Sequence, residues 1–348
     1  MARGVDSRSV AGLGEAGLLR LILPRLRGAG MLVGPGDDAA QVAAPGGSFV
    51  ISIDTMVQNQ DFRLNWANGS VSTGFDVGWK SAAQNLSDIN AMGAVTTSAV
   101  VSLTLPGETP VAWVEGFADG FSAALKDLGA AECAVAGGDL SAGTELAVST
   151  AVTGRLATEA PVLRSGAAPG DVVAVCGRLG AAAAGLALLE SAVPVDQLDA
   201  CEQGFIAGQH RPRPNLAAGP QAALRGATAM MDLSDGLRRD LPRLAAASGI
   251  AIAIDGKSLE DIAAPGLFEW AVRTGREPRD FLLQAGEDFA LLASFPPGTE
   301  LPECFVQIGT AVGSVEAGTV LLDGHPLADS GWDHFSQSEV VGPESLRE

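Results

Sequence analysis

Apolar and polar residues alternate along this chain with two periods, one typical of helices and one typical of strands. Across residues 75–92 apolar side chains return every three or four positions, which predicts a helix, and Gly93 is well placed to end it. Across residues 48–54 every second side chain is apolar, which predicts a strand with Ser52 and Asp54 together on its other face. Because helices and strands alternate along the chain, we expect an α/β fold of the α+β type.

The rest of the pattern predicts two domains, over residues 1–156 and 157–348. The Gly- and Pro-rich segment 164–171 favours a boundary near residue 156. In the C-terminal domain Ser234 is a candidate N-cap for a helix that starts near Leu237, and Pro242 should weaken that helix after one turn. The other expected elements are strands at 96–105, 133–136, 146–153 and 227–231 and a helix at 111–128.

The charge balance limits the partners of this chain. It has 41 acidic and 22 basic residues, a formal net charge of −19, so it repels phosphate backbones and we expect no nucleic-acid partner. If the ligand is anionic, metal cations have to mediate its binding. The four cysteines form no CxxC pair, which disfavours a zinc site or a disulfide framework and favours reduced thiols in a cytoplasmic protein.

The apolar segment near the N-terminus does not indicate a membrane protein. Residues 17–27 are interrupted by Arg20 and Pro24, so we expect an amphipathic helix there rather than a signal peptide. No segment reaches transmembrane length, and we therefore expect no membrane partner.

Acidic residues recur where apolar elements end. One such turn is ordinary, because Gly-Asp turns are abundant in proteins. Several together favour a shared site for Mg²⁺ and phosphate, since this hard cation binds carboxylate oxygens along with substrate phosphates. Two of the carboxylates are adjacent, and their repulsion predicts a positive group close by. The positions are Asp37, Asp38, Asp54, Asp88, Asp139, Asp232 and Asp235.

Other phosphate-binding and catalytic devices are missing from the sequence. Residues 256–258 resemble the end of a Walker A loop, but Ala251 stands where its first glycine belongs. The three histidines lie late in the chain, and no GxSxG or HExxH motif occurs, which disfavours a hydrolase. The lack of a base suits a phosphate monoester as acceptor, because its second pKa near about 6 leaves it mostly deprotonated at neutral pH.

Eight motifs resemble, in order, those of the thiamine-monophosphate kinase family, in the superfamily of aminoimidazole ribonucleotide synthetase. The resemblance implies a two-domain fold of that superfamily, a homodimer whose N-terminal sheets pair, and direct transfer of the γ-phosphoryl group of ATP to thiamine monophosphate with several Mg²⁺ ions. The motifs are GPGDDAA, SIDTMVQ, KSAAQNLSDINAMGA, AGGDL, RSGAAPGD, DLSDG, AGEDFAL and GWDHF.

The resemblance also implies roles for single residues. Gly138, Arg164 and Ser234 would contact ATP, and Glu287 and Trp332 would contact the thiamine end. The implied Mg²⁺ ligands are Asp38, Ser52, Ile53 through its backbone, Asp54, Asp88, Asp139, Asp232 and Asp235. The residues expected to be catalytic are Asp88, Asp139, Asp232 and Lys80. Lys80 shares the helix face of Asp88, so it either helps to neutralise phosphate or forms an ordinary surface ion pair.

Two departures from the family pattern leave alternatives open. Asp61, in the substrate-binding region, stands where the family usually has a histidine, and an ionised carboxylate can only accept hydrogen bonds. Ala118 replaces an aromatic residue that many members place near the nucleotide. The alternatives are a superfamily member with another acceptor, such as an amidine or a selenide, and a nucleotide-binding regulatory protein without turnover.

Overall fold

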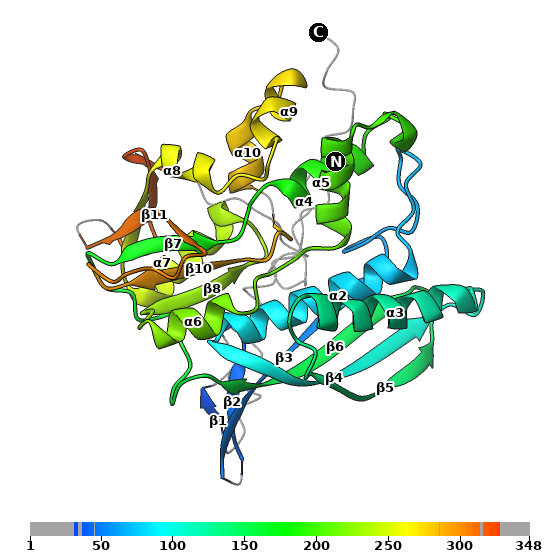
Figure 1. Ribbon diagram of the computed structural model, residues 1–348, viewed down its shortest axis with the longest axis horizontal. Helices are drawn as coiled ribbons and strands as arrows, with labels where there is room; N and C mark the ends of the chain where they lie inside the picture. Colours follow the sequence, from blue (N-terminus) through cyan, green and yellow to red (C-terminus); the bar gives the residue numbers. More distant parts are fainter. Residues whose placement is uncertain (1–30, 34–36, 45, 285, 314–315, 328–348) are drawn as a thin grey trace, which may run out of the picture. The chain divides into compact units, whose positions relative to one another are not determined.

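The computed structural model describes residues 31–33, 37–44, 46–284, 286–313 and 316–327 (Figure 1). The helix expected at residues 17–27 and the candidate ligand-binding residue Trp332 lie outside these ranges. Among the helices that the structure describes, none has the length and apolar character needed to cross a lipid bilayer.

The first half of the chain forms a six-stranded sheet with two helices on one face (Figure 1). β4 and β5 are parallel, and the other neighbouring strands are antiparallel. The strand order is β1-β2-β3-β6-β4-β5, with β1 at Met31–Val33, β2 at Ala40–Ala44, β3 at Gly47–Val57, β4 at Ala94–Leu105, β5 at Ala134–Ala142 and β6 at Ala147–Leu156. The helices are α2 at Gly74–Ala91 and α3 at Val111–Asp127. The strands and helices predicted here are confirmed, except for the length of β5.

β5 is longer than the sequence indicates. The pattern suggests a strand that ends before the glycine pair, but the pairing with β4 continues to Ala142. Gly138 allows this close pairing, because a Cβ atom at that position would lie 1.9 Å from the carbonyl oxygen of Val101. Asp139 therefore lies within an exposed edge strand and not in a turn after it.

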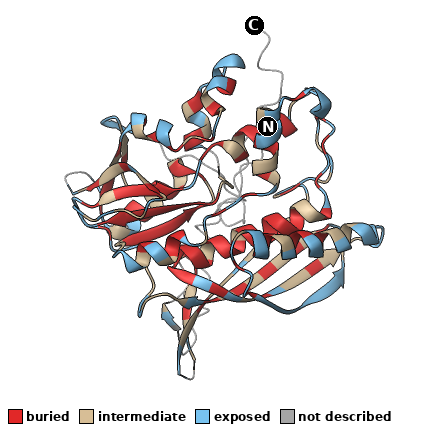
Figure 2. Cartoon of the chain, viewed as in Figure 1, coloured by how far each residue is buried: buried red, intermediate tan, exposed pale blue. Residues whose placement is uncertain are grey.

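The second half forms a seven-stranded sheet with the order β13-β12-β9-β11-β7-β10-β8. Strands β7 and β10 and the edge strand β8 are buried on both faces, as Figure 2 shows. The strands are β7 at Val172–Cys176, β8 at Ala229–Leu233, β9 at Ala251–Ile254, β10 at Ala290–Phe295, β11 at Phe305–Val312, β12 at Val320–Leu322 and β13 at His325–Pro326. The helices are α4 at Ala181–Leu189, α5 at Ala200–His210, α6 at Ala218–Leu224, α7 at Leu237–Ser248, α8 at Gly256–Asp261, α9 at Leu267–Arg273 and α10 at Pro278–Leu283, with a 3-10 turn at Val195–Gln197.

Three details of the β8–α7 unit differ from the prediction. The N-cap of α7 is Gly236 and not Ser234, and Asp232 belongs to β8 instead of following it. The helix also continues past Pro242 to Ser248. Leu241 and Leu244, which flank the proline, are fully buried, and this packing stabilises the helix despite the lost backbone hydrogen bond.

The contact between α2 and α3 depends on glycines. A Cβ atom on Gly78 would lie 2.1 Å from the carbonyl oxygen of Phe117, and one on Gly120 would lie 2.0 Å from that of Phe75. A capping box between Thr73 and Asp76 fixes the start of α2. The two helix backbones therefore meet without intervening side chains, and α2 is held tightly over the sheet.

Replacing Gly78 by alanine should destabilise the protein by about 1–3 kcal/mol, because the methyl group overpacks the helix contact. Urea unfolding measures this change. Gly204→Ala on α5 is the matched control, since nothing lies within 4 Å of its Cβ position, and alanine should stabilise that helix by up to about 1 kcal/mol. Equal effects of the two substitutions would contradict the close contact.

Candidate active site

Three of the predicted metal-binding carboxylates come together in the structure. Asp38 precedes β2, Asp88 lies in the last turn of α2, and Asp232 lies in β8. One carboxylate oxygen from each lies within 4.8 Å of the other two. Asp38 and Asp232 are buried, and Asp88 is half-buried. Residues that are almost 200 positions apart thus form one acidic cluster.

Arg164 supplies the positive group that the adjacent carboxylates predict. Its guanidinium Nη2 donates to Asp38 Oδ1 at 2.6 Å, and its backbone amide donates to Asp37 Oδ2 at 2.9 Å. Burial and the neighbouring Asp38 charge still raise the pKa of Asp37 to about 6, against these hydrogen bonds. The second oxygen of Asp38 is buried and has no hydrogen-bond partner among the described residues.

β3 presents the expected polar face to α2. The Ser52 hydroxyl donates to Asp88 Oδ2 at 2.5 Å, and the Asp54 amide donates to Asn85 Oδ1 at 3.1 Å. Burial raises the pKa of the Asp54 carboxyl to about 6, although a hydrogen bond from Gln84 opposes this shift. Ser52 and Asp54 therefore both face the helix that carries Asp88.

The electrostatics of the cluster favour a bound cation. Burial holds the pKa of Asp88 well above its usual range, and the charges of Asp54, Asp232 and Asp38 add to the shift. Burial also raises the pKa of Asp232, and the negative charge of Asp38 is the second cause of this shift. Carboxylates so placed ionise together when a divalent cation offsets their repulsion, and the buried unpartnered oxygen of Asp38 is a suitable ligand atom. The residues present fit Mg²⁺.

Three further predicted ligands, Asp235, Asp139 and Ile53, lie outside this cluster. Asp235 pairs with Arg243, whose Nη1 lies 2.6 Å from Asp235 Oδ2, and with Arg239 at 3.6 Å. Asp139 is exposed on β5 and accepts a hydrogen bond from Ser141 at 2.9 Å. Ile53, the predicted backbone ligand, is 62% exposed on β3.

Asp139 and Gly138 border a mostly apolar hollow of about 580 Å³ between α3 and the β4–β5 edge of the sheet. Its wall includes Val101, Phe117 and Ala118. A hollow with apolar walls and one acidic end suits a flat heterocycle joined to a polar group.

A second polar group surrounds Lys80. The ammonium Nζ lies 2.5 Å from Glu287 Oε1 and 3.3 Å from Gln209 Oε1, and it also approaches the carbonyl oxygen of Asp61 at 3.5 Å. The Asp61 carboxylate accepts a hydrogen bond from the Val57 amide at 2.7 Å. Lys80 is 5% exposed and Glu287 is half-buried, so this is a partly buried ion pair and not the surface pair that the sequence left as an alternative.

Ser234 adjoins this second group through its backbone. Its carbonyl oxygen accepts a hydrogen bond from the Glu287 amide at 2.9 Å. Burial lowers the pKa of the nearby His210 to about 4, so this imidazole is neutral at physiological pH.

Sequence reasoning missed three polar residues of these groups. Gln209 links Lys80 to Glu287, and Asp240 and Arg243 surround Asp235. No local pattern marks Gln209. Asp240 had a weak signal, because it is an acidic residue in the first turn of a helix whose apolar stripe contains its neighbour Leu241.

This chain is similar to known proteins over most of its length. The family model of the AIR synthase related protein N-terminal domain matches residues 36–156, and that of the C-terminal domain matches residues 168–316. The thiamine-monophosphate kinase of Mycobacterium tuberculosis is 38% identical over 97% of this chain and 96% of its own length.

Solved structures are similar over nearly the whole chain. AaThiL complexed with AMPPCP and TMP matches with a TM-score of 0.82 and 30% identity, covering 95% of this chain and all of that one. The thiamine monophosphate kinase of Aquifex aeolicus matches with a TM-score of 0.76 and 29% identity, covering 90% of this chain and 98% of that one.

Mg²⁺ should stabilise the folded protein more strongly as the pH rises. Asp37 and Asp54 have folded pKa values of about 6 and Asp240 of about 7, above the unfolded value near about 3.9. Between these values the folded state binds more protons, so without metal its stability falls as the pH rises from about 4 to 7. Metal binds to the deprotonated carboxylates, so with Mg²⁺ the stability should rise with pH instead of falling. At a free Mg²⁺ concentration a hundred times Kd, binding should add about 2.7 kcal/mol to the free energy of unfolding.

Calorimetric melting between pH 5 and 8, with EDTA and with Mg²⁺, checks this expectation. Asp88→Asn should lose most of the Mg²⁺-dependent shift. Asp119→Asn, an exposed site on α3, is the matched control and should keep it. A shift in Tm that is the same at every pH would contradict the assignment.

Proposed function

Because the chain belongs to the thiamine-monophosphate kinase family within the AIR synthase related proteins, we propose that it transfers the γ-phosphoryl group of ATP to thiamine monophosphate. The observation that carries the proposal is the cluster of Asp38, Asp88 and Asp232 beside Arg164. Such a cluster is adapted to hold cations against the phosphates of a donor and an acceptor. The product would be thiamine diphosphate.

The carboxylate cluster would hold the metal ions. Bound Mg²⁺ would offset the negative charge of the phosphates and orient them. Asp38, Asp88 and Asp232 supply the central oxygens, and the Ser52 hydroxyl holds the Asp88 carboxylate in place. The remaining proposed ligands are Ile53 through its backbone, Asp54, Asp139 and Asp235.

ATP would lie between the hollow and this cluster. The apolar wall with Ala118 would take the base, Gly138 would contact the nucleotide, and Arg164 and Ser234 would contact the phosphates. The guanidinium of Arg164 is a suitable phosphate ligand because it is charged at every physiological pH and presents several N–H donors in one plane.

No side-chain base is needed for the transfer. An oxygen of the acceptor phosphate attacks the γ-phosphorus, a new P–O bond forms in line, and the bond to the β-phosphate oxygen breaks to release ADP. The acceptor oxygen is already deprotonated at neutral pH. Asp61, Glu287 and Trp332 are the proposed substrate-binding residues, and Glu287 and Trp332 would contact the thiamine end of the acceptor.

We also propose that the protein is cytoplasmic and acts as a homodimer that pairs its N-terminal sheets. The face of that sheet away from the helices carries exposed apolar side chains, including Val95 and Val100 on β4, which are 38% and 44% exposed. Burying such side chains against a second copy would remove apolar surface from water.

Purified protein with ATP and Mg²⁺ should convert thiamine monophosphate to thiamine diphosphate and leave thiamine unchanged. Chromatography of the thiochrome derivatives separates the products. Asp88→Asn should lower kcat by at least about 100-fold while the protein stays folded. ATP binding without product would favour either another acceptor or a regulatory protein without turnover. In the first case Asp61 would be the first residue to test.

The proposed dimer predicts a mass in solution of twice the 35.2 kDa of one chain. Val100→Lys should weaken it, because pairing would bury the new charge. Val111→Lys, on the 73% exposed N-terminal residue of α3, is the matched control and should leave the mass unchanged. Multi-angle light scattering over a dilution series measures both. A monomeric parent protein would end the dimer proposal.

A further inference from the structure

Lys80 has no hydrogen-bond donor left for a phosphate. A lysine ammonium has three N–H donors, and here three protein acceptors surround it: Glu287 Oε1, Gln209 Oε1 and the Asp61 carbonyl oxygen. The acidic cluster lies elsewhere on the same helix, because Asp88 is two turns further along α2. The position of Lys80 therefore suggests that it acts on Glu287.

Both oxygens of the Glu287 carboxylate are held. Oε1 contacts Lys80, and Oε2 accepts a hydrogen bond from Gln209 Nε2 at 2.6 Å. The Gln209 amide therefore donates to the carboxylate and accepts from the ammonium, so the three side chains form a closed ring of contacts. The Glu287 side chain is still 33% exposed, and each of its oxygens keeps lone-pair capacity for another donor.

The backbone around Glu287 is fixed as tightly as its side chain. Glu287 has a φ of 68°, a left-handed conformation that costs an L-residue about 1–2 kcal/mol. Its amide bonds the Ser234 carbonyl at 2.9 Å. On the next residue, the Asp288 carboxylate accepts from the backbone amides of Gly180 at 2.6 Å and Ala182 at 2.9 Å, at the start of α4. Strain of this kind persists where the surroundings impose it, and it is concentrated at ligand-binding positions.

The charges in the ring decide what Glu287 can recognise. Lys80 neutralises the Glu287 carboxylate at 2.5 Å, so the pair offers a ligand hydrogen-bond acceptors and little net charge. An acceptor of this kind selects an N–H group, as on an amino-substituted heterocycle, and disfavours an anionic phosphate.

We propose that Lys80 is a positioning residue that, with Gln209, holds Glu287 to accept an N–H group from the heterocyclic end of the acceptor substrate. The inference rests on the proposed function, because it assumes a phosphorylated acceptor with an amino-heterocycle such as the aminopyrimidine of thiamine monophosphate. It replaces the phosphate-neutralising role expected for Lys80 from the sequence.

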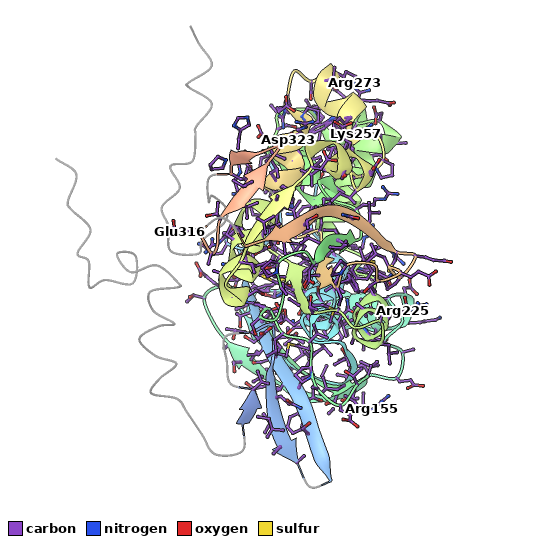
Figure 3. All side chains as sticks on the ribbon, turned by 90° about the vertical axis from the view of Figure 1, so that its left-hand side faces the viewer. Arg155, Arg225, Lys257, Arg273, Glu316 and Asp323 are labelled. Carbon is purple, nitrogen blue, oxygen red and sulfur yellow. The ribbon has the colours of Figure 1, made fainter. Side chains whose placement is uncertain are left out.

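Steady-state kinetics of Lys80→Met, Lys80→Arg and Gln209→Ala test the assignment. Loss of a charge-assisted hydrogen bond should raise the KM for thiamine monophosphate about 10- to 100-fold in Lys80→Met and Gln209→Ala. The KM for ATP should stay within about twofold in both. Lys80→Arg should recover part of the affinity. Lys257→Met, on an exposed residue of α8 that Figure 3 labels, is the matched control and should match the parent protein.

A second readout separates positioning from a purely structural role. The parent protein should prefer thiamine monophosphate over its 4-deamino analogue, in which a hydrogen atom replaces the amino group, and Lys80→Met and Gln209→Ala should lose most of this preference. Removing the buried lysine of this ion pair leaves the Glu287 charge without its partner and is itself destabilising, so a second variant is needed in case Lys80→Met does not fold. Gln209→Ala leaves the ion pair intact and carries the test in that case.

The outcomes separate the two proposals. If the parent protein makes no thiamine diphosphate, both proposals are overturned before any variant is compared. If the parent is active and folded variants change kcat or the KM for ATP but not the KM or the preference for the acceptor, only the assignment of Lys80 is overturned. Loss of acceptor affinity together with loss of the amino preference supports it.

Discussion

The repulsion between three carboxylates, two of them buried and one half-buried, is the constraint on which the rest of this structure depends. Oxygens of Asp38, Asp88 and Asp232 lie within 4.8 Å of one another, where the effective dielectric constant is low and like charges interact strongly. The three residues come from a bend before β2, from α2 and from β8, so none of them could form the cluster within its own element. The first sheet, its covering helix and the second sheet must all be packed before these charges meet.

α2 is the element that holds the polar groups of the site in fixed positions. Its start is fixed by the Thr73–Asp76 capping box, and its flank is held against α3 by glycines that leave no room for a side chain. β3 lies against its polar stripe, with Ser52 bonded to Asp88 and the Asp54 amide bonded to Asn85. A helix held on several sides has little freedom to move, and its polar groups are correspondingly preorganised.

The sequence predicts much of this arrangement, and it fails where long-range contacts decide the structure. The 3.6-residue period of α2 and the twofold period of β3 are strong signals, so both elements and the shared face of Ser52 and Asp54 follow from local pattern. The sequence predicts too short a β5, because paired glycines usually indicate a turn, whereas here they allow close strand pairing. The partner of Lys80 lies 207 positions away, and no local spacing links it to Glu287 or to Gln209.

α2 also sets the distance between the two polar groups that it carries. Lys80 and Asp88 are eight residues apart, and a rise of about 1.5 Å per residue sets their separation along the helix axis near 12 Å. One of these residues holds the proposed heterocycle contact and the other belongs to the proposed phosphoryl-transfer cluster, so the helix fixes the distance between the two ends of an acceptor. The backbone of α2 thus selects acceptors by their length. Side-chain substitutions in either site alone would leave the distance between the two sites unchanged.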